Sequence, residues 1–238
     1  MTNMSTLHTL VFYATPEHEC SYLPDKSATT LFVDPRAHIN TETYSQLTQL
    51  GFRRSGNHYY KPNCAGCRSC VPLRLPVNDF RPGRGVRRVL KKNEHTTTNI
   101  RQAEYREEHY RLYEQYINFK HSDGDMYPPT SDQYQSFLID SPKTTQFVEF
   151  WHKGCLFCVA VVDTLMDGLS AIYTFYDPEF KHLSPGKFAI LWQISETRRL
   201  GNPFLYLGYW IKGCQKMDYK ASFRPLEMFI NGRWLKVS

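Results

Sequence analysis

Three cysteines stand at regular intervals in one short stretch, as Cys64, Cys67 and Cys70. Thiolates at this spacing can ligate a single metal ion, with a fourth ligand supplied from elsewhere in the chain. A ferredoxin-type run would need a further cysteine where Arg74 stands, so that template does not apply. The spacing leaves open a zinc ion, an iron–sulfur cluster or free thiols, and Cys20 is the candidate fourth ligand.

A basic stretch is the second distinctive feature of the sequence. Residues 81–92 read RPGRGVRRVLKK and contain no acid, and the rest of the chain is neutral although the whole carries a formal charge of +6. Clustered Lys and Arg bind nucleic acid by displacing counterions from its phosphates, whereas an ordinary charge run only faces solvent. The nucleic-acid interpretation rests on five side chains, Arg84, Arg87, Arg88, Lys91 and Lys92.

The elements that position these residues predict an α+β fold. In the C-terminal part, helices at 104–120 and 132–139 precede three strands joined by hairpin turns, followed by a helix at 187–200, a strand at 204–210 and a final hairpin. The N-terminal part reads as a small α/β unit that contains the cysteine cluster. The basic stretch, with its glycines and proline, is the natural linker, so we predict domains at 1–77 and 78–238.

The order of elements in the C-terminal part resembles the acyltransferase fold of the N-acetyltransferase (GNAT) superfamily. In that fold, backbone N–H groups between a central strand and the following helix face the phosphates of the donor. The corresponding loop would hold Ser184, Gly186 and Lys187, although an ordinary strand-to-helix turn has the same appearance. No pattern typical of a serine or cysteine hydrolase accompanies it, which fits a donor that is already activated as an ester.

Composition excludes several other classes. Hydrophobic residues make up 41% of the 238 residues, which is typical of a globular protein and not of a disordered one. No run of about 18 apolar residues is present, so we expect no membrane partner, and the first ten residues do not read as a secretory signal. The seven cysteines are an odd number, and three of them stand too close together for an ordinary disulfide framework, so a reducing cytoplasm fits best.

Three separated stretches, covering nearly the whole chain, resemble the arginyl-tRNA–protein transferase family. They are CSYLPDKSATTLFVD at 20–34, GFRRSGNHYYKPNC at 51–64 with its continuation to residue 74, and a third set at 173–220 that includes YTFYDP and YLGYWIKGCQKM. Leu23 stands where the arginyl branch has a second cysteine, and Val71 follows Cys70 where that branch has a cysteine pair. This pattern is that of the bacterial branch, the aspartate/glutamate leucyltransferases, and it puts a carry-over of the arginyl branch's iron–sulfur binding in doubt.

The resemblance implies a function with two substrates. The enzyme would move leucine from leucyl-tRNA to proteins that begin with Asp or Glu, which marks them for N-end-rule degradation, and no cofactor is required. Tyr176 and Asp177 are the candidate proton acceptors for the attacking amine. The acidic side chain of the acceptor needs a cation, from Arg53, Arg54, Lys61 or Arg74. Neighbouring arginines on a strand face opposite ways, so we expect only one of Arg53 and Arg54 to reach the pocket. Candidates for tRNA contact beyond the basic stretch are Tyr206, Tyr209, Lys212 and Lys216, besides the loop at Ser184, Gly186 and Lys187.

Two other functions are compatible with parts of the sequence. An acetyl-CoA-dependent N-acetyltransferase would share the predicted fold order, but it leaves the cysteine cluster and the basic stretch unexplained. A non-enzymatic RNA-binding module with a structural metal would explain those two features and not the motifs of the C-terminal part. A third alternative keeps the family and replaces leucine with arginine.

Overall fold

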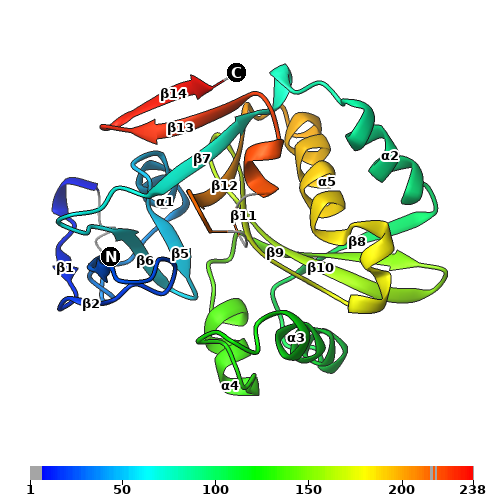
Figure 1. The fold of residues 1–238 in the computed structure, drawn as a ribbon, viewed down its shortest axis with the longest axis horizontal. Coiled ribbons are helices and arrows are strands. Elements are labelled where there is room, and N and C mark those ends of the chain that lie inside the picture. Colours follow the sequence, from blue (N-terminus) through cyan, green and yellow to red (C-terminus); the bar gives the residue numbers. More distant parts are fainter. Residues whose placement is uncertain (1–6, 215–216, 218, 238) are drawn as a thin grey trace.

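The computed structural model describes residues 7–214, 217 and 219–237, and Figure 1 shows its elements. The N-terminal part contains a four-stranded antiparallel sheet in the order β1-β4-β6-β5 and a separate pair, β2 and β3. After the 3₁₀ turn η1 (Leu7–Thr9), the elements are β1 (Phe12–Ala14), β2 (His18–Glu19), β3 (Ser27–Ala28), β4 (Thr30–Val33), α1 (Thr41–Gln49), β5 (Arg53–Ser55) and β6 (His58–Pro62). The core of this part is formed by α1, β4 and β6, where Val33, Leu47 and Tyr59 are buried.

The larger sheet has eight strands in the order β14-β13-β7-β12-β11-β10-β9-β8. They are β7 (Cys70–Pro76), β8 (Thr96–Gln102), β9 (Thr145–His152), β10 (Cys155–Thr164), β11 (Gly168–Tyr176), β12 (Phe204–Ile211), β13 (Leu226–Ile230) and β14 (Arg233–Val237). The helices are α2 (Arg84–Lys92), α3 (Glu107–Lys120), α4 (Ser131–Tyr134), which continues into the π-helical turn η3 (Gln135–Ile139), and α5 (Pro185–Arg199). Three 3₁₀ turns complete this part, η2 (Val77–Asp79), η4 (Pro178–Leu183) and η5 (Tyr219–Ser222).

Helices cover both faces of this sheet, which explains why residues 156–162 of β10 form an uninterrupted apolar run. Cys158 and Ala160 contribute to the core that includes α5, whereas Val159 and Val161 contribute to the core that includes α3. Successive side chains of a strand point to opposite faces, so a strand buried on both sides reads as one apolar run. The mixed α+β class is thus confirmed, and no helix in the described ranges has the length and apolar character needed to cross a bilayer.

Strand β7 connects the two parts of the chain. It lies before the boundary predicted at residue 77, yet it pairs with β12 over Cys70–Pro76 and with β13 at Leu73 and Arg74. The large sheet therefore draws one of its inner strands from the N-terminal segment, as Figure 1 shows.

The basic stretch is a helix and not the expected linker. Val86 and Val89 in α2 pack against the core that includes α5, while all five Arg and Lys side chains of this helix are exposed. Apolar residues three positions apart lie on one face of a helix, so the spacing of these two valines determines which face of α2 packs against the core. The consequence is a rigid display of basic side chains on one outer surface.

The parallel contact between β11 and β12 is short. It joins Gly168–Ser170 to Phe204–Tyr206, and no further pairs follow. Beyond it, β12 has an irregular register between Tyr206 and Gly208 against β7, and Gly208 adopts a φ of +75°. The two strands therefore separate toward their C-terminal ends, and the backbone at Gly208 faces this opening without a side chain.

A buried carboxylate on β9 organises the outer end of the sheet. Glu149, 1% exposed, accepts hydrogen bonds from Arg101 Nε (2.6 Å), His109 Nε2 (2.9 Å) and Trp151 Nε1 (3.1 Å). An ionised carboxylate only accepts, so Nε2 of His109 carries the proton, and Nδ1 has no hydrogen-bond partner in the described ranges. This arrangement holds a neutral histidine against an ionised glutamate.

Both groups make the protein less stable at low pH. Burial lowers the pKa of His109, although the neighbouring Glu149 opposes this shift. Burial by itself would raise the pKa of Glu149, but the hydrogen bonds that it accepts from His109 and Trp151 outweigh burial and lower its pKa. A lowered folded-state pKa means that the unfolded chain binds more protons, so stability is lost as pH falls. Protonation of the histidine lowers stability below about pH 6.5, and protonation of the glutamate lowers it below about pH 4.5.

We expect the free energy of unfolding to fall between pH 7.5 and pH 5.5, by up to ~1.4 kcal/mol per pH unit for one proton. His109→Gln should remove most of this loss, because the amide keeps a donor for Glu149 and does not titrate. Urea midpoints at the two pH values measure the effect. An equal loss in the wild type and the variant would assign the pH dependence to other groups.

Candidate functional site

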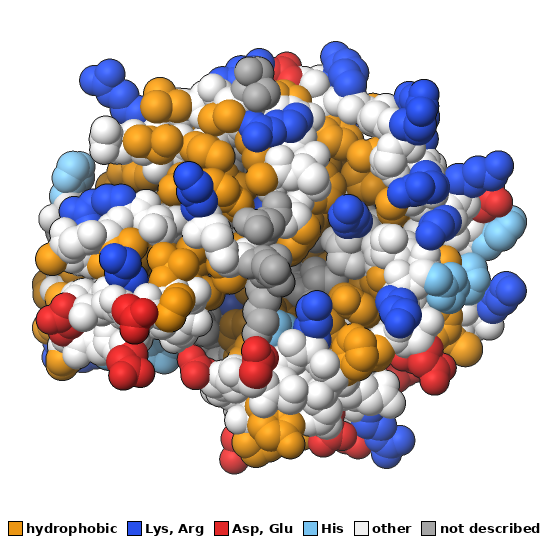
Figure 2. Space-filling model, in the orientation of Figure 1, with side chains coloured by type: hydrophobic (Ala, Val, Ile, Leu, Met, Phe, Trp, Pro, Cys, Tyr) orange, Lys and Arg blue, Asp and Glu red, His pale blue; other side chains and the backbone are white. Residues whose placement is uncertain are grey.

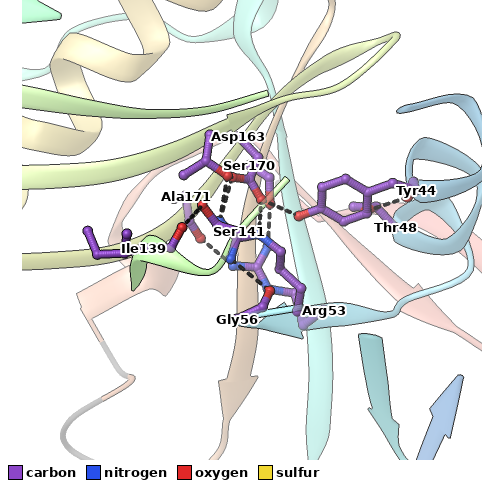
Figure 3. Close-up of polar contacts among 11 residues, drawn as sticks. Tyr44, Thr48, Arg53, Gly56, Ile139, Ser141, Asp163, Ser170 and Ala171 are labelled. Carbon is purple, nitrogen blue, oxygen red and sulfur yellow. Dashed lines mark hydrogen bonds and ion pairs between the residues drawn. The ribbon is translucent and has the colours of Figure 1, made fainter. Parts of the chain in front are cut away.

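The opening between β11 and β12 receives a buried arginine from the N-terminal sheet. Arg53, 8% exposed, extends from β5 and donates from Nη1 to Ser170 Oγ at 2.7 Å and from Nη2 to the carbonyl of Ala171 (Figure 3). A Cβ atom at Gly208 would lie 3.1 Å from Arg53 Nε and 3.2 Å from its Cζ. The guanidinium group therefore lies against bare backbone, at the point where the two strands part.

Its neighbour Arg54 points elsewhere, as alternation along a strand requires. Its Nε and Nη2 donate to the two carboxylate oxygens of Asp163 at 2.5 and 2.6 Å, and neither side chain has exposed surface. Asp163 also accepts from Tyr44 Oη and Thr145 Oγ1, both at 2.6 Å. Figure 3 labels two members of this network, Asp163 and Tyr44, beside Arg53. Arg54 is thus fully engaged in joining β5 to β10 and is closed to a ligand.

Two further candidates for binding an acidic side chain also have partners. Arg74 donates from Nε to Glu227 Oε2 at 2.6 Å, and its Cζ lies 3.6 Å from the ring centroid of Phe204. Lys61 lies over the ring of Phe52, with Nζ 5.4 Å from the centroid, and burial lowers its pKa. Of the four predicted cations, Arg53 is the buried one that contacts no carboxylate in the described ranges.

The candidate proton acceptors lie at the end of β11. Burial raises the pKa of Tyr176, whose ring centroid is 4.8 Å from that of Tyr116, so its hydroxyl stays protonated at neutral pH. The carboxylate of Asp177 caps η4 by accepting from the N–H of Glu179 at 2.9 Å. Tyr176 is therefore a hydrogen-bond donor, and Asp177 already has a structural task.

The predicted tRNA contacts divide into exposed and buried groups. The basic side chains of α2 are exposed, as is Lys187, and Figure 2 shows Lys and Arg gathered over the part of the surface where α2 lies. Tyr206 and Tyr209 are 2% and 8% exposed, and their hydroxyls donate to Asp167 and to the carbonyl of Gly51, both at 2.8 Å. Both tyrosines pack inside the protein and are closed to stacking on a base.

The remaining donor candidates flank α5 and β12. Ser184 adopts a left-handed conformation, with φ of +58°, and its side chain makes no capping hydrogen bond to α5. A Cβ atom at Gly186 would meet nothing within 4 Å, so the backbone there is open on one side. Lys212 is exposed in the turn after β12, and Lys216 lies outside the described residues.

The four cysteines proposed as metal ligands are all free and partly buried. Burial, and then the charges of Cys20, Cys64, Cys67 and Cys214, raise the pKa of Cys70 to about 11, which shows that these thiols lie near one another. Within the described ranges, however, no three His, Cys, Asp or Glu side chains are arranged to hold a metal ion. The residues present do not form a ready metal site, and zinc or iron–sulfur binding stays a prediction.

Sequence reasoning missed one cation at this opening. Lys220, in η5, donates from Nζ to the carbonyl of Tyr209 at 2.9 Å. Burial and then the charge of Arg53 lower the pKa of Lys220 to about 7. A lone lysine between an alanine and a tyrosine has no distinguishing spacing, so only the tertiary structure identifies it.

Comparison with known proteins places the whole chain in one family. The models for the N terminus and the C terminus of arginine-tRNA-protein transferase match residues 18–88 and 108–230. Aspartate/glutamate leucyltransferases from Marinobacter nauticus and Hahella chejuensis are 55% and 52% identical, over 99% and 98% of this chain and 99% and 100% of their own. The one from Pseudomonas aeruginosa is 50% identical over 99% of this chain and 100% of its own.

One matching solved structure is more distant than these sequences. L-PGS from Bacillus licheniformis aligns with a TM-score of 0.45 at 11% identity, over 60% of this chain and 46% of its own. The assignment therefore rests on the two family models and on the full-length relatives. On that basis the chain belongs to the arginine-tRNA-protein transferase family.

Proposed function

We propose that this protein transfers leucine from leucyl-tRNA to the N-terminal Asp or Glu of acceptor proteins. The observation that carries the proposal is 50–55% identity, over almost the full length, to proteins named aspartate/glutamate leucyltransferase. The site is compatible with it, because Arg53 is a buried cation and α2 displays exposed basic side chains. We place the reaction in the cytoplasm, where free thiols remain reduced, and propose that the product is directed to degradation.

The C-terminal part would use a GNAT-like arrangement for the acyl donor. Support comes from the short parallel contact between β11 and β12 and from α5, which connects these two strands along the chain. In the opening that results, unpaired backbone groups can bind a substrate without any hydrogen bond between β11 and β12 being broken. The donor's acceptor end would enter from the side of α5, with Ser184, Gly186 and Lys187 near its terminal nucleotide and Lys212 close by.

The chemistry requires little from ionisable side chains. The acceptor's α-amine attacks the ester carbonyl of leucyl-tRNA, a peptide bond forms, and the ribose oxygen of the tRNA leaves with a proton. An α-amine has a pKa of about 8, so roughly a tenth is uncharged at pH 7, and positioning two substrates together can supply a large part of the acceleration. Tyr176 remains protonated and would donate a hydrogen bond to the leaving oxygen, with Asp177 holding the strand end in place.

A transfer assay tests the donor and the acceptor together. Purified protein is offered radiolabelled leucyl-tRNA, arginyl-tRNA or acetyl-CoA, each with peptides that begin with Asp, Glu or Ala. We expect leucine to appear on the Asp and Glu peptides only. Arginine transfer would keep the family and replace the donor, and acetyl transfer without aminoacyl transfer would favour an N-acetyltransferase.

The basic helix should determine how salt affects tRNA binding. Arg87→Ala with Arg88→Ala should weaken binding of leucyl-tRNA and reduce the slope of log affinity against log salt by about one to two, because fewer counterions are released. Arg111→Ala is the matched control, since Arg111 is exposed on α3 and pairs with Glu107. Filter binding between 50 and 300 mM salt measures the slope, and an unchanged slope would make α2 an ordinary solvated helix.

A further inference from the structure

Two cations from different parts of the chain meet where β11 and β12 separate. Arg53 comes from β5 and lies against Gly208, and Lys220 comes from η5 and donates to the carbonyl of Tyr209, the next residue of β12. Arg53 is 8% exposed, and Lys220 is partly buried. The charge of Arg53 affects the ionisation of Lys220, so the two groups are electrostatic neighbours.

Neither cation has a carboxylate within ion-pair distance in the described ranges, whereas Arg54, Arg74 and Lys236 each do. The groups that interact electrostatically with the pair are instead the Cys214 thiol and the hydroxyls of three tyrosines, one of which, Tyr44 on α1, donates to Asp163. Tyr60 on β6 and Tyr209 on β12 both have pKa values raised by burial and partly lowered again by Arg53. Their protonated hydroxyls bring no negative charge to the pair.

Two like charges held close together and partly shielded from water oppose each other unless an anion joins them or one becomes neutral. Arg cannot lose its proton at ordinary pH, so the lysine responds. Burial and Arg53 bring the pKa of Lys220 to about 7, and about half of these lysines are neutral at that pH in the protein alone. A carboxylate placed between the two groups would favour the charged lysine again.

We infer that Arg53 and Lys220 form a two-cation seat for the side-chain carboxylate of an acidic N-terminal residue, and that Lys220 takes up a proton when this carboxylate binds. The inference deepens the proposed function and rests on its acceptor class. Gly208 has a part in the seat, because a side chain there would displace the guanidinium group. An Asn or Gln side chain of the same shape has no charge to offset the two cations, so the seat rejects it.

The test is binding of acceptor peptides to the full chain without any tRNA. Two fluorescent peptides that differ only in beginning with Asp or Asn are titrated by anisotropy from pH 6 to pH 9. Both carry the same α-amine, so the ratio of their Kd values isolates the side chain. In the wild type we expect the preference for Asp to fall up to about tenfold per pH unit above pH 7 as Lys220 loses its proton.

Variants at the lysine separate charge from packing. Lys220→Arg should keep the preference for Asp and lose its pH dependence, because Arg stays charged throughout this range. Lys220→Met should lower the preference at least about tenfold at pH 6, the loss of one charge-assisted contact. Lys236→Met, which removes an exposed lysine paired with Asp79, should behave as the wild type.

Three results would overturn the seat. They are a wild-type preference that does not change with pH, a Lys220→Met protein that keeps the preference, and a Lys220→Arg protein that keeps the pH dependence; equal melting temperatures establish that each variant is folded. The leucine-transfer assay on the same preparations separates this inference from the proposed function. If leucine is transferred but the preference for Asp over Asn does not depend on pH, only the two-cation seat is overturned. If that preference depends on pH but no leucine is transferred, only the assignment of the donor is overturned.

Discussion

Replacing Arg54 with Met should lower the free energy of unfolding by about 3–5 kcal/mol, the usual cost of leaving one partner of a buried ion pair without the other. Asp163 would keep its hydrogen bonds from Tyr44 and Thr145 but would lose the charge that offsets its own, in a site without exposed surface. Urea unfolding followed by circular dichroism measures the difference.

Two comparisons show whether charge is the cause. Arg36→Met breaks an ion pair with Asp34 in which the arginine side chain is 80% exposed, and it should leave the free energy of unfolding nearly unchanged. Adding Asp163→Leu to Arg54→Met removes the buried charge, and much of the lost stability should return. If the double variant were less stable than Arg54→Met, lost packing would be the dominant cause.

Gly168→Ala should also destabilise the protein, by about 3 kcal/mol, the upper end of ordinary overpacking. A Cβ atom at this position would lie 1.9 Å from the carbonyl oxygen of Phe204, which belongs to the backbone and cannot rotate away. Gly168 and Phe204 are the first pair of the parallel contact between β11 and β12, so the two strands would have to move apart.

Gly85→Ala in α2 is the matched control for this substitution. A Cβ atom there meets nothing within 4 Å, and alanine is a better helix former by up to about 1 kcal/mol, so the variant should be as stable as the wild type or more so. Thermal unfolding of both variants gives the comparison. A Gly168→Ala protein with wild-type stability would mean that β11 and β12 adapt without cost, and that their spacing is not fixed at this point.

Local sequence signals predicted the central strands well. Asp167-Gly168 and Lys153-Gly154 separate apolar runs that became β9, β10 and β11, because a hairpin turn and its flanking strands are encoded together. The same signals failed for β8, whose residues TTTNIRQ are polar apart from one isoleucine. This strand lies at the edge of the sheet, where one neighbour suffices and burial does not shape the sequence.

The site was harder to predict than the fold. The motif at 51–64 identified both Arg53 and Arg54, and strand alternation indicated that they face different ways. Only the position of Asp163, more than 100 residues later in the chain, decides which of the two arginines pairs with a carboxylate. No local sequence pattern predicts that contact. Lys220 was missed for the same reason, since its environment is made by β5 and β12.

Strand β7 has a consequence for how the protein is made. Its partner β12, at Phe204–Ile211, is synthesised well over 100 residues after Cys70–Pro76. At roughly 5–20 residues per second, β7 waits on the order of ten seconds on the ribosome with its sheet edges unpaired. The nascent chain therefore exposes Leu73 and Leu75, which are 1% and 0% exposed in the finished protein, and it should need a chaperone or a temporary partner during that interval.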